Sequence, residues 1–197
     1  MKRTQRWVGL LFLALLLAGC GSKEPTIKVS AAEVNLTGED MGKPATVAEN
    51  TLQEVLALVY QDKDDKTLAR DASMRTFTVS NTQVIVAVMV FDSSAWARGA
   101  LRDARENLEK GLEDGLRTAT QTFDLTMQDL TVPPVGEEGV FVTTDLPAEK
   151  GKVYFLGFCK NNVLGLLIGM GPAAQLDEAW MRDLAQKMSA RWPAATP

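Results

Sequence analysis

The sequence contains no histidine and only two cysteines, and these shortages exclude several kinds of site. Without histidine there can be no Ser-His-Asp triad, no Cys-His pair and no histidine-based zinc site. Two cysteines allow at most one disulfide within the chain. The absence of histidine also removes the commonest general base, and no cofactor or metal is predicted.

The longest apolar run lies at the N-terminus. Lys2, Arg3 and Arg6 precede an apolar stretch from Trp7 to Ala18. About a dozen apolar residues are too few to cross a hydrocarbon core of roughly 30 Å, and a length of this kind is typical of the h-region of a cleaved signal. We therefore predict a signal peptide over residues 1–19.

The end of this run resembles a bacterial lipobox. The residues are Leu17-Ala18-Gly19-Cys20, with small side chains directly before the cysteine. The resemblance implies that Cys20 receives a diacylglyceryl thioether and becomes the new N-terminus, so that the protein is anchored on the extracytoplasmic face of the cell membrane. The residue after Cys20 is Gly21, not the Asp that retains lipoproteins in the inner membrane of some Gram-negative cells. In such a host, by this resemblance, the protein would be free to move to the outer membrane. The alternative is an ordinary signal peptide with an unrelated cysteine.

Positive charge is scarce once the leader is set aside. The chain has 21 Lys+Arg and 25 Asp+Glu; without Lys2, Arg3 and Arg6 the balance is 18 against 25, or −7. An acidic domain repels nucleic acid and anionic membrane surfaces, so nucleic acid is excluded as a partner and membrane attachment must come from lipid. If Cys20 is lipidated, Cys159 has no partner for a disulfide.

Three further segments complete the predicted domain organisation. Residues 20–34 are predicted to be the lipidated cysteine and a flexible tether, because they are polar and small and lack periodicity. Residues 35–192 suit a single α+β domain with a core of its own. Residues 193–197 are predicted to be a disordered tail.

The first half of the domain gives mixed signals. Thr37 and Asp40 have the spacing of a capping box before a short helical turn that ends near Gly42. Asn50 to Tyr60 fits either a helical stripe or a strand, and we favour helix. The acidic cluster from Asp62 to Asp65 lacks the glycine and glutamate of a calcium loop, so it is interpreted as a solvated turn.

A sheet covered on both faces is predicted from the next segments. Arg75 to Ser80 alternates weakly, and Val84 to Phe91 is apolar on both faces, which requires cover on both sides. A long helix is predicted from Asp92-Ser93-Ser94 to about Arg117, with many small residues on its inner face. Phe123 to Leu130 alternates like a strand near an edge, and Val140 to Thr144 is predicted to be a short strand.

The most specific local signal is a hairpin around Asn161-Asn162. A two-residue type I′ turn would place both asparagines at positive φ, Lys160 opposite Val163, and a bulky residue opposite each of three glycines. The matched pairs are Phe158 with Gly165, Tyr154 with Gly169 and Leu166 with Gly157. The glycines are interpreted as room for a helix to pack closely; the alternative is the approach of a ligand to bare backbone.

The same hairpin places Cys159 on an apolar face opposite Leu164. Burial should raise the pKa of this thiol and make it inert, acting as a small hydrophobe. A final amphipathic helix is predicted from Gln175 to Trp192, with Trp180 in the core.

The order of these elements is similar to the PsbP-like fold, an antiparallel sheet packed between α-helices. The residues that carry the resemblance are LTGEDMG at Leu36–Gly42, VGEEG at Val135–Gly139, the hairpin FCKNNVLGL at 158–166 and the helix end Met188–Trp192. The resemblance covers 34–192 and implies a noncatalytic accessory or binding domain of an exported lipoprotein. It supplies no catalytic residue.

Two functions follow as hypotheses. The first is a lipid-anchored binding or accessory module for a protein partner in the cell envelope or a small ligand. The alternative is a carboxylate-dependent cell-envelope hydrolase, for which Glu137 and Glu138 or the acidic residues from Asp62 to Asp65 are the candidates. No catalytic residue is assigned, and the predicted site residue is the lipidation site Cys20.

Overall fold

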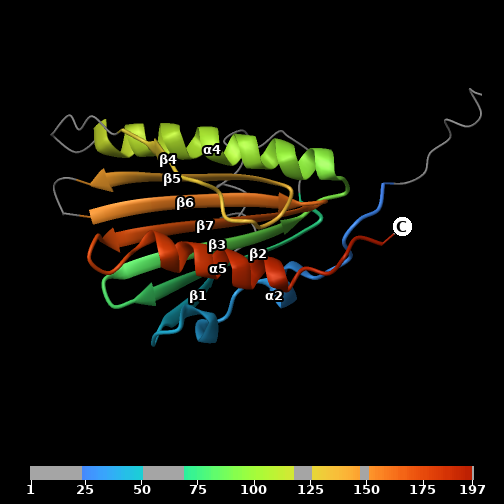
Figure 1. Cartoon of the computed structure of the whole chain (residues 1–197), viewed down its shortest axis with the longest axis horizontal. Coiled ribbons are helices and arrows are strands. Elements are labelled where there is room, and N and C mark those ends of the chain that lie inside the picture. The colour runs from blue at the N-terminus through green and yellow to red at the C-terminus, as the bar shows by residue number, and fades with distance from the viewer. Residues whose placement is uncertain (1–23, 51–68, 118–125, 147–150, 197) are drawn as a thin grey trace, which may run out of the picture.

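The computed structural model describes residues 24–50, 69–117, 126–146 and 151–196. These residues form one antiparallel sheet of seven strands in the order β1-β2-β3-β7-β6-β5-β4 (Figure 1). The strands are β1 (Thr46–Asn50), β2 (Asp71–Val79), β3 (Thr82–Val90), β4 (Gln128–Asp129), β5 (Glu138–Leu146), β6 (Gly151–Lys160) and β7 (Val163–Pro172). The apolar strand β3 lies between β2 and β7 inside the sheet, as its two apolar faces predicted.

Helices cover both faces of the sheet, which confirms the predicted α+β class. The long helix α4 (Ser94–Arg117) lies along one face, and α5 (Glu178–Ala190) lies on the other with the short α2 (Ala31–Val34) and the 3-10 turn η1 (Gly38–Met41) (Figure 1). Alternate residues of the strands feed two separate cores. The core under α4 includes Met89, Leu101, Phe155 and Leu166, and the core under α5 includes Phe77, Val86, Leu156 and Leu184.

The hairpin of β6 and β7 has the predicted register. Lys160 pairs with Val163, Phe158 with Gly165, Tyr154 with Gly169 and Gly157 with Leu166. The packing interpretation of the glycines is also confirmed, because helices occupy the space beside them. A Cβ on Gly157 would lie 2.5 Å from Leu101 Cδ1 of α4, and one on Gly165 would lie 2.6 Å from Met188 Cε of α5.

The turn of this hairpin differs from the prediction. Asn161 has a positive φ of 55°, but Asn162 is not among the residues with positive φ. Asn162 is instead 2% exposed, and its side chain forms three hydrogen bonds. Its conformation is therefore determined by distant parts of the chain rather than by the turn alone.

The predicted tether and tail are wrong over their described residues. Ile27 and Ala31 are buried in the core under α5, and Asn162 Oδ1 accepts a hydrogen bond from the Ile27 amide at 2.6 Å. Thr26 and Thr196 exchange two backbone hydrogen bonds of 3.0 Å each, so the C-terminal residues pair with the N-terminal segment. The domain therefore includes both segments. Their short apolar side chains carried too little periodicity to reveal this.

The capping box at η1 is confirmed, and it connects to α5. Asp40 Oδ2 accepts hydrogen bonds from the Thr37 amide at 2.6 Å and the Thr37 hydroxyl at 2.8 Å. The same carboxylate accepts two hydrogen bonds from Arg191 Nη2, at 2.8 and 2.7 Å. This contact fixes η1 against the end of α5.

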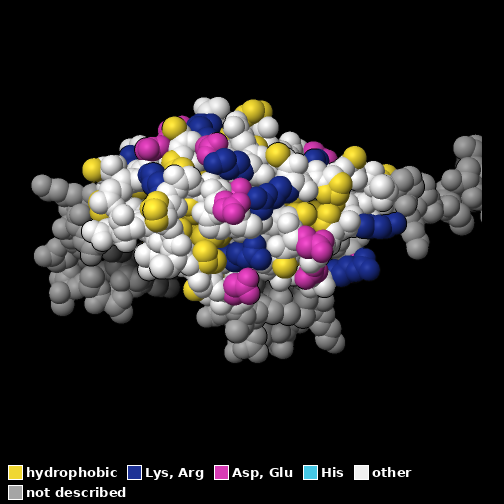
Figure 2. All heavy atoms as spheres, turned by 90° about the horizontal axis from the view of Figure 1, so that it is seen from below, with side chains coloured by type: hydrophobic (Ala, Val, Ile, Leu, Met, Phe, Trp, Pro, Cys, Tyr) yellow, Lys and Arg dark blue, Asp and Glu magenta, His cyan; other side chains and the backbone are white. Residues whose placement is uncertain are grey.

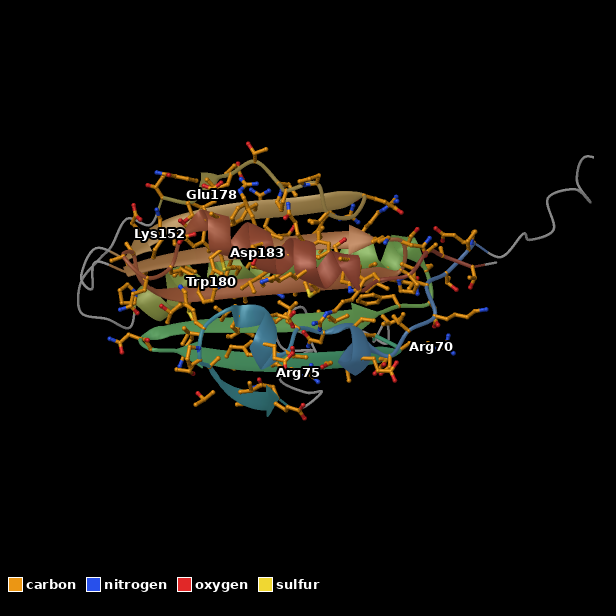
Figure 3. All side chains as sticks on the ribbon, turned by 60° about the horizontal axis from the view of Figure 1, so that its bottom comes forward. Arg70, Arg75, Lys152, Glu178, Trp180 and Asp183 are labelled. Atoms are coloured by element: carbon orange, nitrogen blue, oxygen red, sulfur yellow. The ribbon has the colours of Figure 1, made fainter. Side chains whose placement is uncertain are left out.

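Helix α5 begins later than predicted, because Asp177 is its N-cap and accepts a hydrogen bond from the Trp180 amide at 2.7 Å. Leu184 and Met188 are buried as expected. Trp180, predicted to lie in the core, is only half-buried: its indole N–H donates to the Met41 carbonyl, and Lys43 Nζ lies 4.5 Å from the ring centroid. Figure 3 shows Trp180 at the margin of α5.

Some predictions lie outside the described residues. These are the signal peptide with Cys20, the acidic residues 62–65, and the helix predicted for residues 50–60 except Asn50, which is the last residue of β1. The strand predicted from Phe123 is described only from residue 126. Its described part contains the two-residue edge strand β4, and β5 is longer than expected, beginning at Glu138.

Candidate functional site

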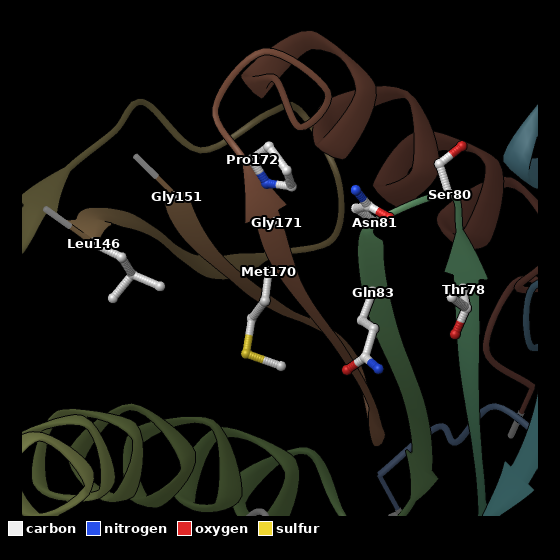
Figure 4. A pocket seen from close by; sticks show the side chains of 9 residues that line it. All are labelled: Thr78, Ser80, Asn81, Gln83, Leu146, Gly151, Met170, Gly171 and Pro172. Atoms are coloured by element: carbon white, nitrogen blue, oxygen red, sulfur yellow. The ribbon is translucent and has the colours of Figure 1, made fainter. Parts of the chain in front are cut away.

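A hollow of about 500 Å³ opens at the end of the sheet where the β2–β3 turn lies (Figure 4). We call this end of the sheet the hollow end, and the opposite end, at Asn161-Asn162, the Asn162 end. The described residues that line the hollow come from five strands and one turn. They are Thr78, Ser80, Asn81, Gln83, Leu146, Gly151, Met170, Gly171 and Pro172.

Strand pairing brings these residues together. Thr78 of β2 pairs with Gln83 of β3, and Gln83 pairs with Met170 of β7, so these three form a row across adjacent strands. Gly151 of β6 pairs with both Pro172 and Leu146. Figure 4 shows Met170, Gln83 and Thr78 pointing to the side of the sheet on which α4 lies. The hollow is therefore a product of the sheet topology.

The lining mixes polar and apolar groups, with more apolar than polar surface, and carries no ionisable side chain among its nine described residues. The hydroxyls of Thr78 and Ser80 and the amides of Asn81 and Gln83 can both donate and accept hydrogen bonds. Leu146, Met170 and Pro172 add apolar contact. The volume falls within the range of about 300–1,000 Å³ that is usual for small-molecule sites. Such a surface can bind an uncharged polar group without transferring a proton.

The candidate carboxylates Glu137 and Glu138 lie away from the hollow, near the first turns of α4. Arg98 Nη2 lies 3.3 Å from Glu137 Oε2, and Arg98 Nε lies 3.6 Å from Glu138 Oε2. All three side chains are between 44% and 50% exposed. Catalysis by a pair of carboxyls requires that the two groups face each other across a cleft. Glu137 and Glu138 instead converge on one exposed guanidinium.

Cys159 is buried under α4, as predicted. It is 1% exposed, and its Sγ donates to the Ala97 carbonyl at 3.3 Å. Burial, reinforced by the charge of Glu138, raises the pKa of the Cys159 thiol to about 12. Lys160 points to the other face and donates to the Trp192 carbonyl. The thiol is therefore protonated at neutral pH and has no route to an external substrate.

The charges on the face of α5 are mixed (Figure 2). Arg182 is paired with Glu178 at 2.5 Å, Lys187 with Asp183 at 2.7 Å, and Arg191 with Asp40 at 2.7 Å. Because each of these cations has an acidic partner, they do not form a basic patch of the kind that binds phosphates.

The described ranges contain neither a candidate metal site nor a candidate membrane-spanning helix. In them, no three His, Cys, Asp or Glu side chains are grouped so that they could hold a metal ion. Over the same ranges, no helix combines the length and the apolar character needed to cross a membrane. The predicted lipidation site Cys20 and the carboxylates at 62–65 lie outside these ranges.

Sequence reasoning missed the hollow. Ser80 was visible only as the end of the alternating segment from Arg75, and the sequence pattern did not single out Asn81, Gln83 or Gly171-Pro172 as members of a site. Their proximity depends on the pairing of β3 with β7, which are separated by more than 70 positions in the chain. No local pattern marks that pairing, so only the row of uncharged polar residues was available as a signal.

Comparison with known proteins shows a likeness of fold. No protein-family model matches the chain, and no curated protein matches it. The fold is similar to a solved structure, the extracellular domain of PknH from Mycobacterium tuberculosis, with a TM-score of 0.52 and 15% sequence identity. The match covers 85% of this chain and 97% of the PknH domain. At this identity the match concerns the fold alone.

Proposed function

We propose that this protein is a membrane-anchored extracytoplasmic lipoprotein that serves as a noncatalytic binding module. In this proposal Cys20 carries the lipid, and the hollow binds an uncharged polar ligand or a short segment of a protein partner in the cell envelope. Nucleic acid is not a partner.

The observation that carries the binding role is the uncharged lining of the hollow. A hydrolase of the alternative type needs two carboxyls across a cleft, and the hollow presents hydroxyls, amides and apolar side chains in their place. No observation favours the hydrolase, because the described candidate carboxylates share Arg98 at the surface.

The extracytoplasmic location rests on two supports. One is the leader with its lipobox-like Leu17–Cys20. The other is the likeness to an extracellular domain, which is an analogy of fold. The PsbP-like resemblance is also kept as a proposal, consistent with a sheet between helices.

The anchor is tested by replacing Cys20 with Ser and fractionating the cells. We expect the wild-type protein to sediment with membranes and the Cys20→Ser variant, once its leader has been removed, to be soluble. Sedimentation of that leaderless variant with membranes would show that something other than a lipid holds the protein there.

The binding role is tested by filling the hollow. Gln83→Trp introduces a large ring into the lining, whereas Glu49→Trp, on exposed β1, is a control outside the hollow that removes the ion pair between the exposed Glu49 and the largely buried Arg75. The intact lipoprotein and both variants are used to capture partners from detergent-solubilised membranes. We expect a partner retained by the wild type and the Glu49 variant to be lost from the Gln83 variant. Equal retention by all three would exclude the hollow as the binding site.

A further inference from the structure

We infer that the Asn162 end of the sheet faces the lipid bilayer, with Trp96 at the level of the headgroups, so that the hollow opens away from the membrane. This inference rests on the proposed lipid anchor at Cys20. It follows from the contacts that hold residues 24–27 to the domain and from the side chains that surround those contacts.

The N-terminal segment is held at the Asn162 end by three contacts. Ser94 Oγ at the start of α4 donates to Glu24, Thr26 pairs with Thr196, and the Ile27 backbone bonds to Asn162 through both its amide and its carbonyl. Figure 1 shows the N-terminal segment and the C-terminus at the same end of the molecule as the start of α4. The chain therefore leaves the domain at this end.

Little chain remains between these contacts and the proposed anchor. Glu24 is four residues from Cys20, and four extended residues span at most about 14 Å. The nine residues of β3 run from the hollow end to the Asn162 end and span about 30 Å. The Asn162 end must therefore lie close to the bilayer. The hollow end could approach the lipid only if the whole domain lay flat.

Trp96 favours the orientation in which the Asn162 end faces the bilayer and the hollow end points away from it. It lies in the first turn of α4, two residues from Ser94, and is 50% exposed. Among the described residues, the exposed large hydrophobic side chains are Trp96 and Val47. A tryptophan with an apolar ring and a polar N–H is the side chain that favours the membrane interface. Its position beside the point where the chain leaves the domain fits a lipid headgroup layer.

The charges at this end are mixed and permit such contact. Lys28 and Arg70 are exposed there, and so are Glu24 and Asp92. Figure 3 shows Arg70 and Lys152 at opposite ends of the molecule. Orientation in this account comes from the short connection and from Trp96, so a neutral phosphatidylcholine surface is sufficient.

The test places a fluorescent thiol label at each end of the lipidated protein. Ala95→Cys and Asn81→Cys are both exposed sites, Cys20 is blocked by its lipid, and Cys159 is 1% exposed. Each protein is purified from membranes, checked by mass for the acylated N-terminus, and reconstituted into phosphatidylcholine vesicles that contain a doxyl-labelled lipid quencher. We expect severalfold stronger quenching at position 95 than at position 81. Equal quenching would mean that the domain lies flat or tumbles, and would overturn the inference.

The role of Trp96 has its own control. Adding Trp96→Ser should reduce the quenching of the label at position 95, whereas adding Val47→Ser, at the other exposed hydrophobic residue, should leave it unchanged. Unchanged quenching in the Trp96 variant would show that Trp96 does not contact the membrane interface. The mass measurement separates the two proposals. An unmodified Cys20 refutes the lipoprotein proposal and this inference together, whereas an acylated Cys20 with equal quenching refutes this inference alone.

Discussion

Two hairpin turns at opposite ends of the sheet have nearly the same φ angle at their first residue and different surroundings. Ser80 has a φ of 54° and Asn161 a φ of 55°, and each is followed by an asparagine. Asn81 is exposed and lines the hollow, whereas Asn162 is 2% exposed. Asn162 bonds to Ile27 and to the Phe91 carbonyl. Turn chemistry is therefore local, whereas the role of a turn depends on which distant segment covers it.

The largest expected effect separates the two asparagines. Asn162→Ala should lower the free energy of unfolding by about 2–4 kcal/mol, because it leaves the buried Ile27 amide and Phe91 carbonyl without this partner. Asn81→Ala should change it by no more than about 0.5 kcal/mol. Urea unfolding of both variants measures the difference. Similar unfolding midpoints for the two variants would mean that the buried hydrogen bonds of Asn162 add nothing to the free energy of unfolding.

A second pair compares glycines at the two ends. A Cβ on Gly165, near the Asn162 end, would lie 2.6 Å from Met188 Cε and 3.0 Å from the Trp192 ring. A Cβ on Gly151, in the hollow, would meet its nearest atoms at 3.4 Å, an ordinary contact. Gly165→Ala should therefore cost about 1–3 kcal/mol, and Gly151→Ala should be close to neutral. Thermal unfolding of the two variants checks this; a greater loss in the Gly151 variant would contradict tight packing at the Asn162 end.

A third and smaller effect concerns pH. The pKa of Cys159 is raised in the folded state to about 12, so the folded protein retains a proton that the unfolded chain releases above its own thiol pKa of about 8.5. The stability due to the protonated thiol is complete below that unfolded pKa and is lost as pH rises toward the folded value. The wild type should lose roughly 1 kcal/mol more than Cys159→Ala between about pH 9 and pH 10.

Urea unfolding at several pH values measures the Cys159 effect, with Gln83→Cys at the hollow end as a comparison for thiol access. A maleimide should label the hollow-end thiol quickly and Cys159 only after unfolding. Parallel pH profiles for the wild type and Cys159→Ala, or rapid labelling of native Cys159, would place this thiol in solvent.

The sequence predicted the elements whose signals are local. The hairpin register followed from bulky residues opposite Gly157, Gly165 and Gly169, and the inward face of Cys159 followed from strand alternation. The packing of residues 26–34 and the role of Asn162 could not be predicted in this way. The Ile27–Asn162 bond joins residues 135 positions apart, and a buried amide side chain looks the same in sequence as an exposed one.

Separation along the chain also explains why the sequence did not reveal the hollow or the surroundings of Glu137 and Glu138. The hollow requires β3 to pair with β7, a long-range choice that no motif specifies. Glu137 and Glu138 were visible as a dense acidic pair, but their shared partner Arg98 lies on α4, 39 positions from Glu137. Sequence patterns thus located the candidate side chains, whereas their surroundings depend on tertiary packing that the patterns do not specify.

The most direct test of the central claim, that the N-terminal segment is pinned to the Asn162 end, is amide hydrogen exchange at Ile27 in the folded protein. We expect the Ile27 amide, which donates to Asn162 Oδ1 at 2.6 Å in a buried site, to exchange as slowly as the amides of the central strands. We expect the Asn81 amide, in the exposed turn, to exchange faster. Exchange of the Ile27 amide at the rate of an unstructured chain would contradict the account, because the segment would then be a free tether and would place no end of the sheet near the anchor.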